Sequence, residues 1–402
     1  MLLRETPWII VSNLVLRGDP SGQGDGIRCD RVQESTKAIE GIEILRCHAS
    51  GFAWHGIMVD ASQRSSGFDR VRISECTTEQ NRHAGIMVYG GNPTGRRFRP
   101  HSRIVIERCV SRNNPGAPEE LQHHSGSGIL LDGVDRGLIQ GCVASGNGAE
   151  CRNDRGGPVG IWIHASRSVV IEDCESHHNQ STLRDGGGFD LDGGCEDSVL
   201  RFNFSHHNHG PGLMAYTYTG AAYSDRNCRI QNNVSWNDGA PGSGYAGLQI
   251  GSEDGGQIRG LKVENNLVVA PARSTAAVRV MGRSIEAELR HNLVIGAQDG
   301  ALVSISGFDH ALRFIDNRYW RPNGTPLFLV DSKWSIPALG SWKNAMGPDS
   351  RFRSSDESFG NPGLRIELPD TGPAQSLIPR VPRLRFGWDR IPTPLEAGPQ
   401  AP

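Results

Sequence analysis

A short phrase that recurs at a near-constant interval constrains the fold more than any other feature of this sequence. The first five copies, of which "IVIERCVSRNN" is typical, place a cysteine after a run of alternating apolar residues. Their cysteines are 29, 33, 33 and 32 residues apart: Cys47, Cys76, Cys109, Cys142 and Cys174. Later copies carry asparagine in the same slot: Asn203, Asn233, Asn266, Asn292 and Asn317. The register therefore persists through ten repeats.

A second column of polar residues follows the first at a fixed distance. Five residues after the slot, six successive repeats carry an asparagine or its acidic counterpart: Asn81, Asn114, Asn147, Asn179, Asn208 and Asp238. Asparagine tolerates the left-handed backbone conformation of a sharp turn, and stacked asparagine side chains can hydrogen-bond to one another. The column therefore predicts a turn at this position, stabilised by a ladder of asparagine side chains.

Most repeats also contain a second short apolar segment near a glycine, such as "AGIMVY" at 84–89 and "VGIWIH" at 159–164. Two short strands joined by turns cannot bury a hydrophobic face alone, so successive repeats must stack. The composition agrees, because 51 glycines and 6% aromatic residues indicate a thin core with frequent turns. Stacking also explains how 402 residues avoid splitting into separate globular cores.

These repeats resemble the right-handed parallel β-helix of the pectate-lyase-like class. The resemblance implies an all-β solenoid of about ten coils over residues 1–320. Residues 321–402 break the repeat, and we expect an irregular C-terminal extension there, with a capping segment and a proline-rich tail. Within such a stack the cysteines face inward and fill the lumen as small hydrophobic side chains. We therefore expect buried, reduced cysteines rather than disulfides or a zinc site.

Charge and hydropathy restrict the partners and the location. The formal net charge of −2 provides no global field for nucleic acid or an anionic membrane. The sequence contains no run of about 18 apolar residues, which excludes a membrane-spanning helix. The start, "MLLRETPWIIVSNLVLRGDP", lacks the features of a secretory signal. Either the protein is cytoplasmic, or its N-terminal cap and export signal are missing; the resemblance favours the second reading, with an extracellular or periplasmic location.

The segment "GGGFDLDGG" at 186–194 is the candidate catalytic strand. Because side chains alternate along a strand, its two aspartates, Asp190 and Asp192, are expected to face solvent together. Two carboxyl groups on one strand face are what glycosidic chemistry needs, since mutual repulsion raises the pKa of one and leaves an acid beside a base. Exposed aspartates can also serve only to solubilise a sheet.

Alignment of the neighbouring segments adds polar residues around this pair. It places Trp162 and His164 on the preceding coil and Tyr216 on the following one, each step being about 4.8 Å. His164 and Tyr216 are candidate catalytic proton carriers, and Trp162 offers an apolar plate for a sugar ring. The whole outer face could hold a polysaccharide across the coils.

Insertions on consecutive coils are expected to form one wall beside the acidic strand, where functional loops normally lie. Arginines on these insertions would bind a carboxylate of an acidic sugar in bidentate fashion. The predicted substrate-binding residues are, besides Trp162, these: Arg152, Arg155, Arg184, Asp185, His123, His124 and Tyr218.

The repeated "SHHN" at 176–179 and 205–208 raises a metal hypothesis. His177 and His206 occupy equivalent turn positions on adjacent coils and could reach one ion, but the spacing supplies no third ligand. We favour a role in stacking the turns over a transition-metal site. Calcium bound by Asp185, Asp190 and Asp192 suits the oxygen ligands better, although no cofactor is required.

The characteristic catalytic sets of pectate lyases, polygalacturonases and mannuronan epimerases are absent from this sequence, so no catalytic residues are carried over from them. Three functions are left open. The first is a carbohydrate-active enzyme that hydrolyses a glycosidic bond in a polysaccharide with Asp190 and Asp192. The second is a lyase that removes the proton α to a uronate carboxylate. The third is a carbohydrate-binding or surface repeat protein without catalysis. The sequence does not indicate the oligomeric state.

Overall fold

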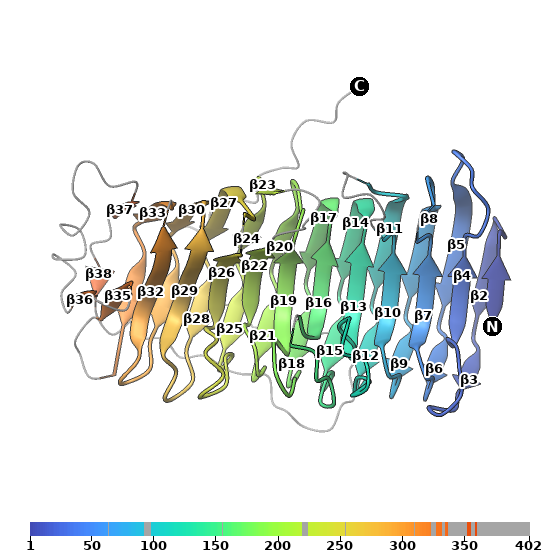
Figure 1. The fold of residues 1–402 in the computed structure, drawn as a ribbon, viewed down its shortest axis with the longest axis horizontal. Coiled ribbons are helices and arrows are strands. Elements are labelled where there is room, and N and C mark those ends of the chain that lie inside the picture. Colours follow the sequence, from blue (N-terminus) through green and yellow to red (C-terminus); the bar gives the residue numbers. More distant parts are fainter. Residues whose placement is uncertain are drawn as a thin grey trace.

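The computed structural model describes residues 1–62, 64–91, 98–154, 156–218, 224–253, 255–308, 310–322, 327–331, 334–336, 352–354 and 358–359. Every regular element among them is a β-strand, and the chain winds into a solenoid whose coils contribute strands to three long sheets (Figure 1). The predicted all-β parallel β-helix is confirmed. Most of the predicted C-terminal extension at 321–402, including the proline-rich tail, lies outside the described residues.

The first sheet, sheet A, carries the candidate catalytic strand. Its strands, in spatial order, are β1 (Leu2–Arg4), β4 (Ile27–Asp30), β7 (His55–Asp60), β10 (Ala84–Tyr89), β13 (Ser127–Asp132), β16 (Val159–His164), β19 (Gly187–Asp192), β22 (Leu213–Thr217), β26 (Leu248–Ser252), β29 (Ala276–Arg283), β32 (Ala301–Phe308), β35 (Phe328–Val330) and β36 (Trp334–Ile336). Neighbours pair in parallel, as β10 does with β13, and β35 with β36 is an antiparallel pair at the end.

Sheets B and C form the other two sides. Sheet B contains β2 (Ile9–Ser12), β5 (Ile39–Leu45), β8 (Phe68–Ser74), β11 (His101–Glu107), β14 (Val134–Gln140), β17 (Arg167–Glu172), β20 (Val199–Arg201), β24 (Arg229–Gln231), β27 (Ile258–Glu264), β30 (Ile285–Arg290), β33 (Ala311–Ile315) and β37 (Phe352–Ser354), with β23 (Asp225–Arg226) paired to β27. Sheet C contains β3 (Val15–Arg17), β6 (His48–Ser50), β9 (Thr77–Glu79), β12 (Val110–Arg112), β15 (Val143–Ser145), β18 (Glu175–His177), β21 (Phe204–His206), β25 (Val234–Trp236), β28 (Leu267–Val269), β31 (Leu293–Ile295), β34 (Arg318–Trp320) and β38 (Ser358–Phe359).

The lumen is filled by apolar columns that run along the stack. In sheet A one such column is fully buried and in register from coil to coil: Ile57, Ile86, Ile129, Ile161, Phe189 and Leu213. All nine cysteines of the chain are free and buried, as predicted. The core is therefore one continuous apolar cluster, and the alternation of side chains sends the residues between these positions to the outer face.

Cysteine and asparagine share one slot because each presents an acceptor to the coil before it. The Cys109 sulfur accepts the backbone N–H of Cys76 at 3.4 Å, and the Asn203 Oδ1 atom accepts that of Cys174 at 3.0 Å. Asn203 also donates through Nδ2 to Asn233 at 3.0 Å. Both residue types thus satisfy a backbone donor that lies inside the stack, which a purely apolar side chain would leave unpaired.

The second asparagine column is a buried, hydrogen-bonded ladder, as predicted, but the other reason given for it, tolerance of a left-handed turn, was wrong. The Asn147 Nδ2 atom donates to Asn179 Oδ1 at 2.9 Å, and the same contact recurs from Asn179 to Asn208. The left-handed turn residue is the one before each ladder position, for example Asn113 and His178, with φ of 50° and 55°. Ladder asparagines are therefore selected by hydrogen bonding rather than by tolerance of positive φ.

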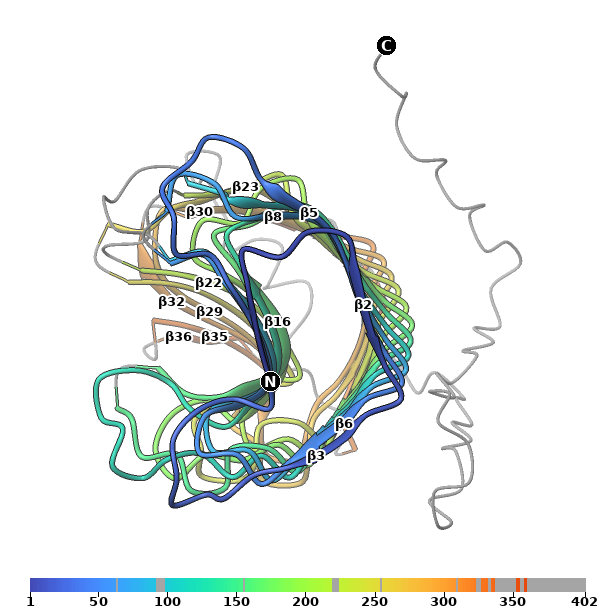
Figure 2. The same ribbon diagram turned by 90° about the vertical axis from the view of Figure 1, so that its right-hand side faces the viewer.

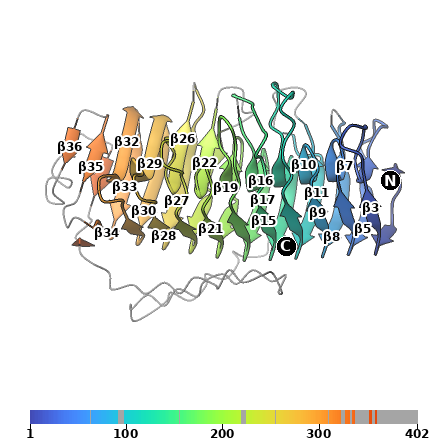
Figure 3. The same cartoon turned by 90° about the horizontal axis from the view of Figure 1, so that it is seen from below.

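Loops extend past sheet A at both ends of its strands when the solenoid is viewed along its axis (Figure 2). Seen from below, the strands again follow one another in chain order along the long axis (Figure 3). This arrangement leaves the outer face of sheet A between two rows of loops. No described residue belongs to a helix with the length and apolar character needed to cross a membrane.

Candidate active site

A cavity of about 670 Å³ lies on the outer face of sheet A, between the loops that flank it. Residues from seven strands line it, from Tyr89 on β10 to Met281 on β29. Because adjacent strands are about 4.8 Å apart, the cavity follows the solenoid axis for roughly 29 Å. An elongated cavity of this kind matches an extended ligand better than a compact one.

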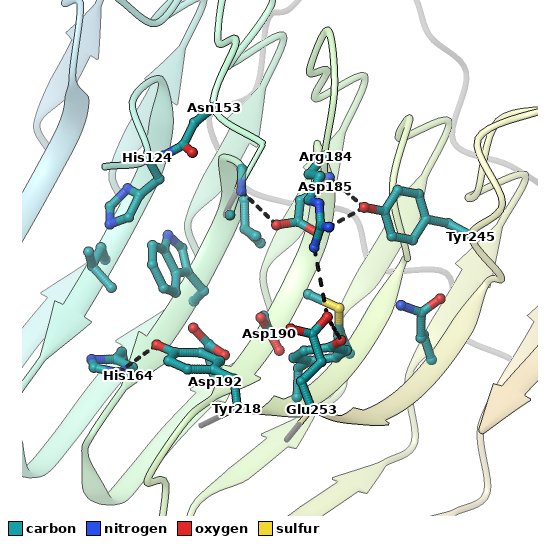
Figure 4. A pocket seen from close by; sticks show the side chains of 18 of the residues that line it. His124, Asn153, His164, Arg184, Asp185, Asp190, Asp192, Tyr218, Tyr245 and Glu253 are labelled. Atoms are coloured by element: carbon teal, nitrogen blue, oxygen red, sulfur yellow. Dashed lines mark hydrogen bonds and ion pairs between the residues drawn. The ribbon is translucent and has the colours of Figure 1, made fainter. Parts of the chain in front are cut away.

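The strand register brings the predicted cluster together. His164 on β16 pairs with Asp192 on β19, which pairs with Tyr216 on β22. On the adjacent column, Trp162 pairs with Asp190. The alignment of segments made from the sequence is therefore confirmed, and these side chains occupy neighbouring positions on one outer face (Figure 4).

Asp190 is buried, in contrast to the prediction that the acidic pair faces solvent. Only 2% of the residue is exposed, and Trp162 and Met214, both buried, flank it in the column. Its Oδ1 atom has no hydrogen-bond partner among the described residues. Burial first, and then the charge of Asp192, raises the pKa of Asp190 well above its usual range. Its surroundings therefore favour the protonated form of the Asp190 carboxyl group.

Asp192 is half-buried. Its environment differs from that of Asp190, because its side chain belongs to a chain of polar contacts. Burial raises the pKa of Asp192 to about 6, and the nearby charge of His164 limits the rise. The Tyr218 hydroxyl hydrogen-bonds to Asp192, and it also lies 3.0 Å from His164 Nε2 (Figure 4). On the far side of the imidazole, His164 Nδ1 is 2.6 Å from the Asp132 carboxylate.

Asp225 is a further buried carboxyl group next to the pair. Its Oδ1 atom accepts the backbone N–H groups of Gly194 and Cys195 at 2.7 and 2.8 Å, and thereby holds the turn after β19. Burial raises the pKa of Asp225 well above its usual range, and the charge of Asp192 adds to the rise. Ionisation of Asp192 therefore makes ionisation of Asp225 less favourable.

One wall of the cavity is a hydrogen-bonded loop structure. Asp185 accepts from the Gly157 backbone at 2.7 Å and from the Tyr245 hydroxyl at 3.2 Å. Nearby, Arg184 is 3.7 Å from Glu253, which accepts a hydrogen bond of 2.7 Å from the Tyr216 hydroxyl. Tyr216 is thus tied to Glu253 rather than to the aspartate pair, although it lines the same cavity.

Two more polar side chains that line the cavity have a buried atom without a hydrogen-bond partner among the described residues. Gln249 follows Met214 in the column that contains Asp190, and its Oε1 atom has no hydrogen-bond partner within the described part of the chain. His124 Nδ1 also has no hydrogen-bond partner among the described residues. The His124 ring lies edge-on to that of Trp162, with ring centroids 4.8 Å apart. Trp162 donates to Ser127 Oγ at 3.2 Å. Buried polar atoms without partners at a cavity are groups that a ligand can satisfy.

Most of the residues predicted from sequence line this cavity. They are Asp190, Asp192, His164, Tyr216, Trp162, Arg184, Asp185, His123, His124 and Tyr218. Arg152 is exposed and is not among the lining residues, although the next residue, Asn153, is. Arg155 lies outside the described residues. Their catalytic and binding roles stay predictions.

Several residues of the site were not singled out from the sequence. Asp132 stood in the same outward column, and its position opposite His164 was the available signal. Asp225, Tyr245 and Glu253 lie in segments without a repeat phrase, so no pattern indicated them. The proposed calcium ligands do not form a close group: among the described residues, only His177, His178 and His206 place three ligand atoms within 4.8 Å of one another. Calcium stays a prediction.

Residues 25–234 match the family described as the right-handed β-helix region. This segment is more than half of the 402 residues, so the chain belongs to that family. A comparison with curated proteins finds no match.

Solved structures with the same architecture are similar to this chain at low sequence identity. A double mutant of the periplasmic alginate epimerase AlgG matches with a TM-score of 0.51 and 14% identity, over 90% of this chain and 77% of that one. The Agl-KA catalytic domain matches with a TM-score of 0.51 and 10% identity, over 88% of this chain and 62% of that one. DFA-IIIase from Arthrobacter chlorophenolicus A6 without its lid has a TM-score of 0.47 and 14% identity, over 73% and 67%. The first two likenesses show the shared fold.

Proposed function

We propose that this protein is a carbohydrate-active enzyme that hydrolyses a glycosidic bond in a polysaccharide or oligosaccharide. The observation that carries the proposal is the placement of Asp190 and Asp192 on one strand face of an elongated cavity, in two different environments. Glycoside hydrolysis uses one carboxyl group as a proton donor and a second as base or nucleophile. Two carboxyl groups whose surroundings separate their pKa values meet that requirement.

Asp190 is the proposed general acid. Its burial between apolar neighbours keeps it protonated, and a proton held in the cavity can pass to the oxygen of the leaving sugar. Asp192 is the proposed base or nucleophile, because its lower pKa and the Tyr218 and His164 contacts support the carboxylate. Alternate residues on a strand have Cβ atoms about 7 Å apart, a separation compatible with either an inverting or a retaining arrangement.

The charges that line the cavity favour a neutral sugar over a uronate. Five acidic residues line it: Asp132, Asp185, Asp190, Asp192 and Glu253. Among the described lining residues the cations are Arg184, Arg279 and the His164 imidazolium, and each has an internal partner: Glu253, the Gly244 carbonyl and Asp132, respectively. A uronate carboxylate would therefore enter a mainly acidic cavity. This argues against the lyase, which needs cations around that carboxylate.

The fold is compatible with a polysaccharide ligand. The alginate epimerase with the same fold acts, by its name, on a polysaccharide. In this chain, the cavity crosses seven strands, and Trp162 and Tyr89 contribute aromatic surface against which sugar rings can pack.

The direct test is incubation with a panel of neutral and uronate-containing polysaccharides and oligosaccharides, following reducing ends and absorbance at 235 nm. Asp190→Asn and Asp192→Asn are the test variants. Asp154→Asn is the matched control, because Asp154 is an exposed loop aspartate outside the cavity lining. We expect new reducing ends without absorbance, reduced about 10²–10⁴-fold in each test variant and unchanged in the control.

Each alternative gives a separate result. Absorbance that rises together with reducing ends would replace hydrolysis by β-elimination. Saturable binding of a saccharide without any cleavage would favour the carbohydrate-binding protein. Activity that survives in both test variants would exclude Asp190 and Asp192 as the catalytic pair. The anomer formed first, observed by NMR, would distinguish inversion from retention.

A further inference from the structure

Four histidines lie together on the turn that follows sheet C, away from the cavity residues described above. His177 ends β18 and His206 ends β21, and the two residues are paired in register. Their rings are parallel, with centroids 4.7 Å apart and an interplanar angle of 3°. The next residues, His178 and His207, are both in the left-handed conformation and stack with centroids 5.2 Å apart.

The left-handed turn directs the rings of adjacent histidines toward each other. The Nδ1 atoms of His177 and His178 are 2.9 Å apart, and those of His206 and His207 are 3.0 Å apart. Two imidazole nitrogens bound to one ion at about 2.0–2.1 Å are separated by about 2.9–3.4 Å, depending on the angle at the metal. The facing Nδ1 atoms of each adjacent pair, which hydrogen-bond to each other, already have this separation. Adjacent histidines on this turn therefore converge rather than point apart.

A carboxylate next to the cluster fixes which nitrogen of His206 is available. Glu175 Oε1 lies 3.0 Å from His206 Nε2. An ionised carboxylate only accepts hydrogen bonds, so the ring proton resides on Nε2 and Nδ1 keeps its lone pair. Carboxylates that orient a histidine through its second nitrogen are a regular part of protein metal sites. A role limited to stacking the turns does not require this contact between Glu175 and His206.

We propose that His177, His178 and His206 bind one divalent transition-metal ion, with His207 beside the site. The ligand atoms of these three histidines all lie within 4.8 Å of one another. Because His178 is exposed, its side chain is free to rotate toward an ion, and small shifts of the stacked His177 and His206 rings would complete the coordination. Imidazole ligands without direct carboxylates select Zn²⁺, Cu²⁺ or Ni²⁺ over Ca²⁺ and Mg²⁺. The ion would connect two adjacent coils through residues that precede the asparagine ladder.

The test uses the untagged full chain after treatment with a chelator. ZnCl₂ and CuSO₄ are titrated by calorimetry, with MgCl₂ and CaCl₂ as ions that should not bind at this cluster. His178→Gln removes an exposed ligand, and a melting curve verifies that the fold is retained. His291→Gln is the matched control, because His291 is also a turn histidine with positive φ but lies on a later coil.

We expect one equivalent of Zn²⁺ or Cu²⁺ to bind to the wild-type chain, and the affinity to fall at least about tenfold in His178→Gln while the control is unchanged. The EPR spectrum of the Cu²⁺ complex should show coupling to three nitrogens, and to two in the variant. Binding that is equal in wild type and His178→Gln would overturn the proposal, as would the absence of stoichiometric binding. Because glycosidase activity is not the readout, this result is independent of the proposed function.

Discussion

The Nδ1 atom of His164 lies 2.6 Å from a carboxylate oxygen of Asp132, although the two residues are 32 positions apart and belong to adjacent coils. Burial by itself would lower the pKa of His164, but the hydrogen bond and charge of Asp132 raise it to about 9. The imidazolium in turn more than offsets burial at Asp132 and lowers the pKa of that carboxyl group. The His164 imidazolium, balanced by the Asp132 carboxylate, therefore lies beside Asp192 at neutral pH.

The activity of the enzyme should show a bell-shaped dependence on pH. Asp192 must be ionised to act as base or nucleophile, and burial raises its pKa to about 6, so kcat/KM should rise as pH increases through this value. The rate should fall at high pH, when the acid Asp190 and the imidazolium of His164, with its pKa of about 9, lose their protons. The measurement is kcat/KM from pH 4 to 10. A flat profile between pH 5 and 7 would contradict the role of Asp192.

The Asp132 and His164 pair should also make stability depend on pH. The folded pKa of His164 is about 9 against an unfolded value of about 6.5, so its contribution is complete below pH 6.5 and is lost as pH rises to 9. Asp132→Asn should therefore lower stability by on the order of 2 kcal/mol at pH 6 and by less at pH 9.5. Urea unfolding at both pH values measures the difference. The control is Asp135→Asn, whose partner Arg167 does not titrate in this range.

Replacement of the proposed acid should separate activity from stability. Asp190→Asn removes a carboxyl group that burial makes costly to ionise, so its effect on the melting temperature should become more favourable as pH rises from 6 to 8. Activity should nevertheless be lost, as set out above. Thermal unfolding of wild type and variant at the two pH values gives the comparison. A difference between variant and wild type that is the same at pH 6 and pH 8 would show that Asp190 is ionised in the folded protein, because both states would then carry the same charge.

The asparagine ladder should contribute measurably to stability. Asn147 donates to Asn179 and to the Ser111 carbonyl, and it accepts from the Asn114 side chain at 2.9 Å. Asn147→Ala should cost about 1–2 kcal/mol, because buried donors and acceptors lose their partner. The urea midpoint is the readout, with Gln33→Ala, at an exposed position, as control. Equal midpoints for both variants would mean that the ladder does not stabilise the stack.

The cysteines should be unreactive until the protein unfolds. All nine are free and buried, and burial raises the pKa of Cys29 to about 12, which suppresses the reactive thiolate. Titration with a thiol reagent should detect few groups in the native protein and all nine after denaturation without reductant. Fewer than nine in the denatured protein would indicate disulfides, in conflict with the structure.

The sequence predicted correctly which residues of the site share one face, but it did not predict how deeply they are buried. The alignment of the short apolar segments near glycine predicted that four residues share one face, and the register confirms it: Trp162, His164, Asp190 and Asp192. It could not predict that Asp190 is 2% exposed, because an outward position on a strand gives no information on how closely the neighbouring side chains pack around it. The same limit explains why Tyr245, Glu253 and Asp225 were missed.

What the sequence determined by itself is the periodic part of the molecule. A side-chain period of two along each strand and a repeat of about 30 residues suffice to specify the parallel β-helix, the buried cysteine slot and the asparagine ladder. The chemistry of the candidate site was decided only by the tertiary structure. The pKa values of Asp190, Asp192 and His164 depend on burial and on charges contributed by other coils, and such distances arise only when the coils stack.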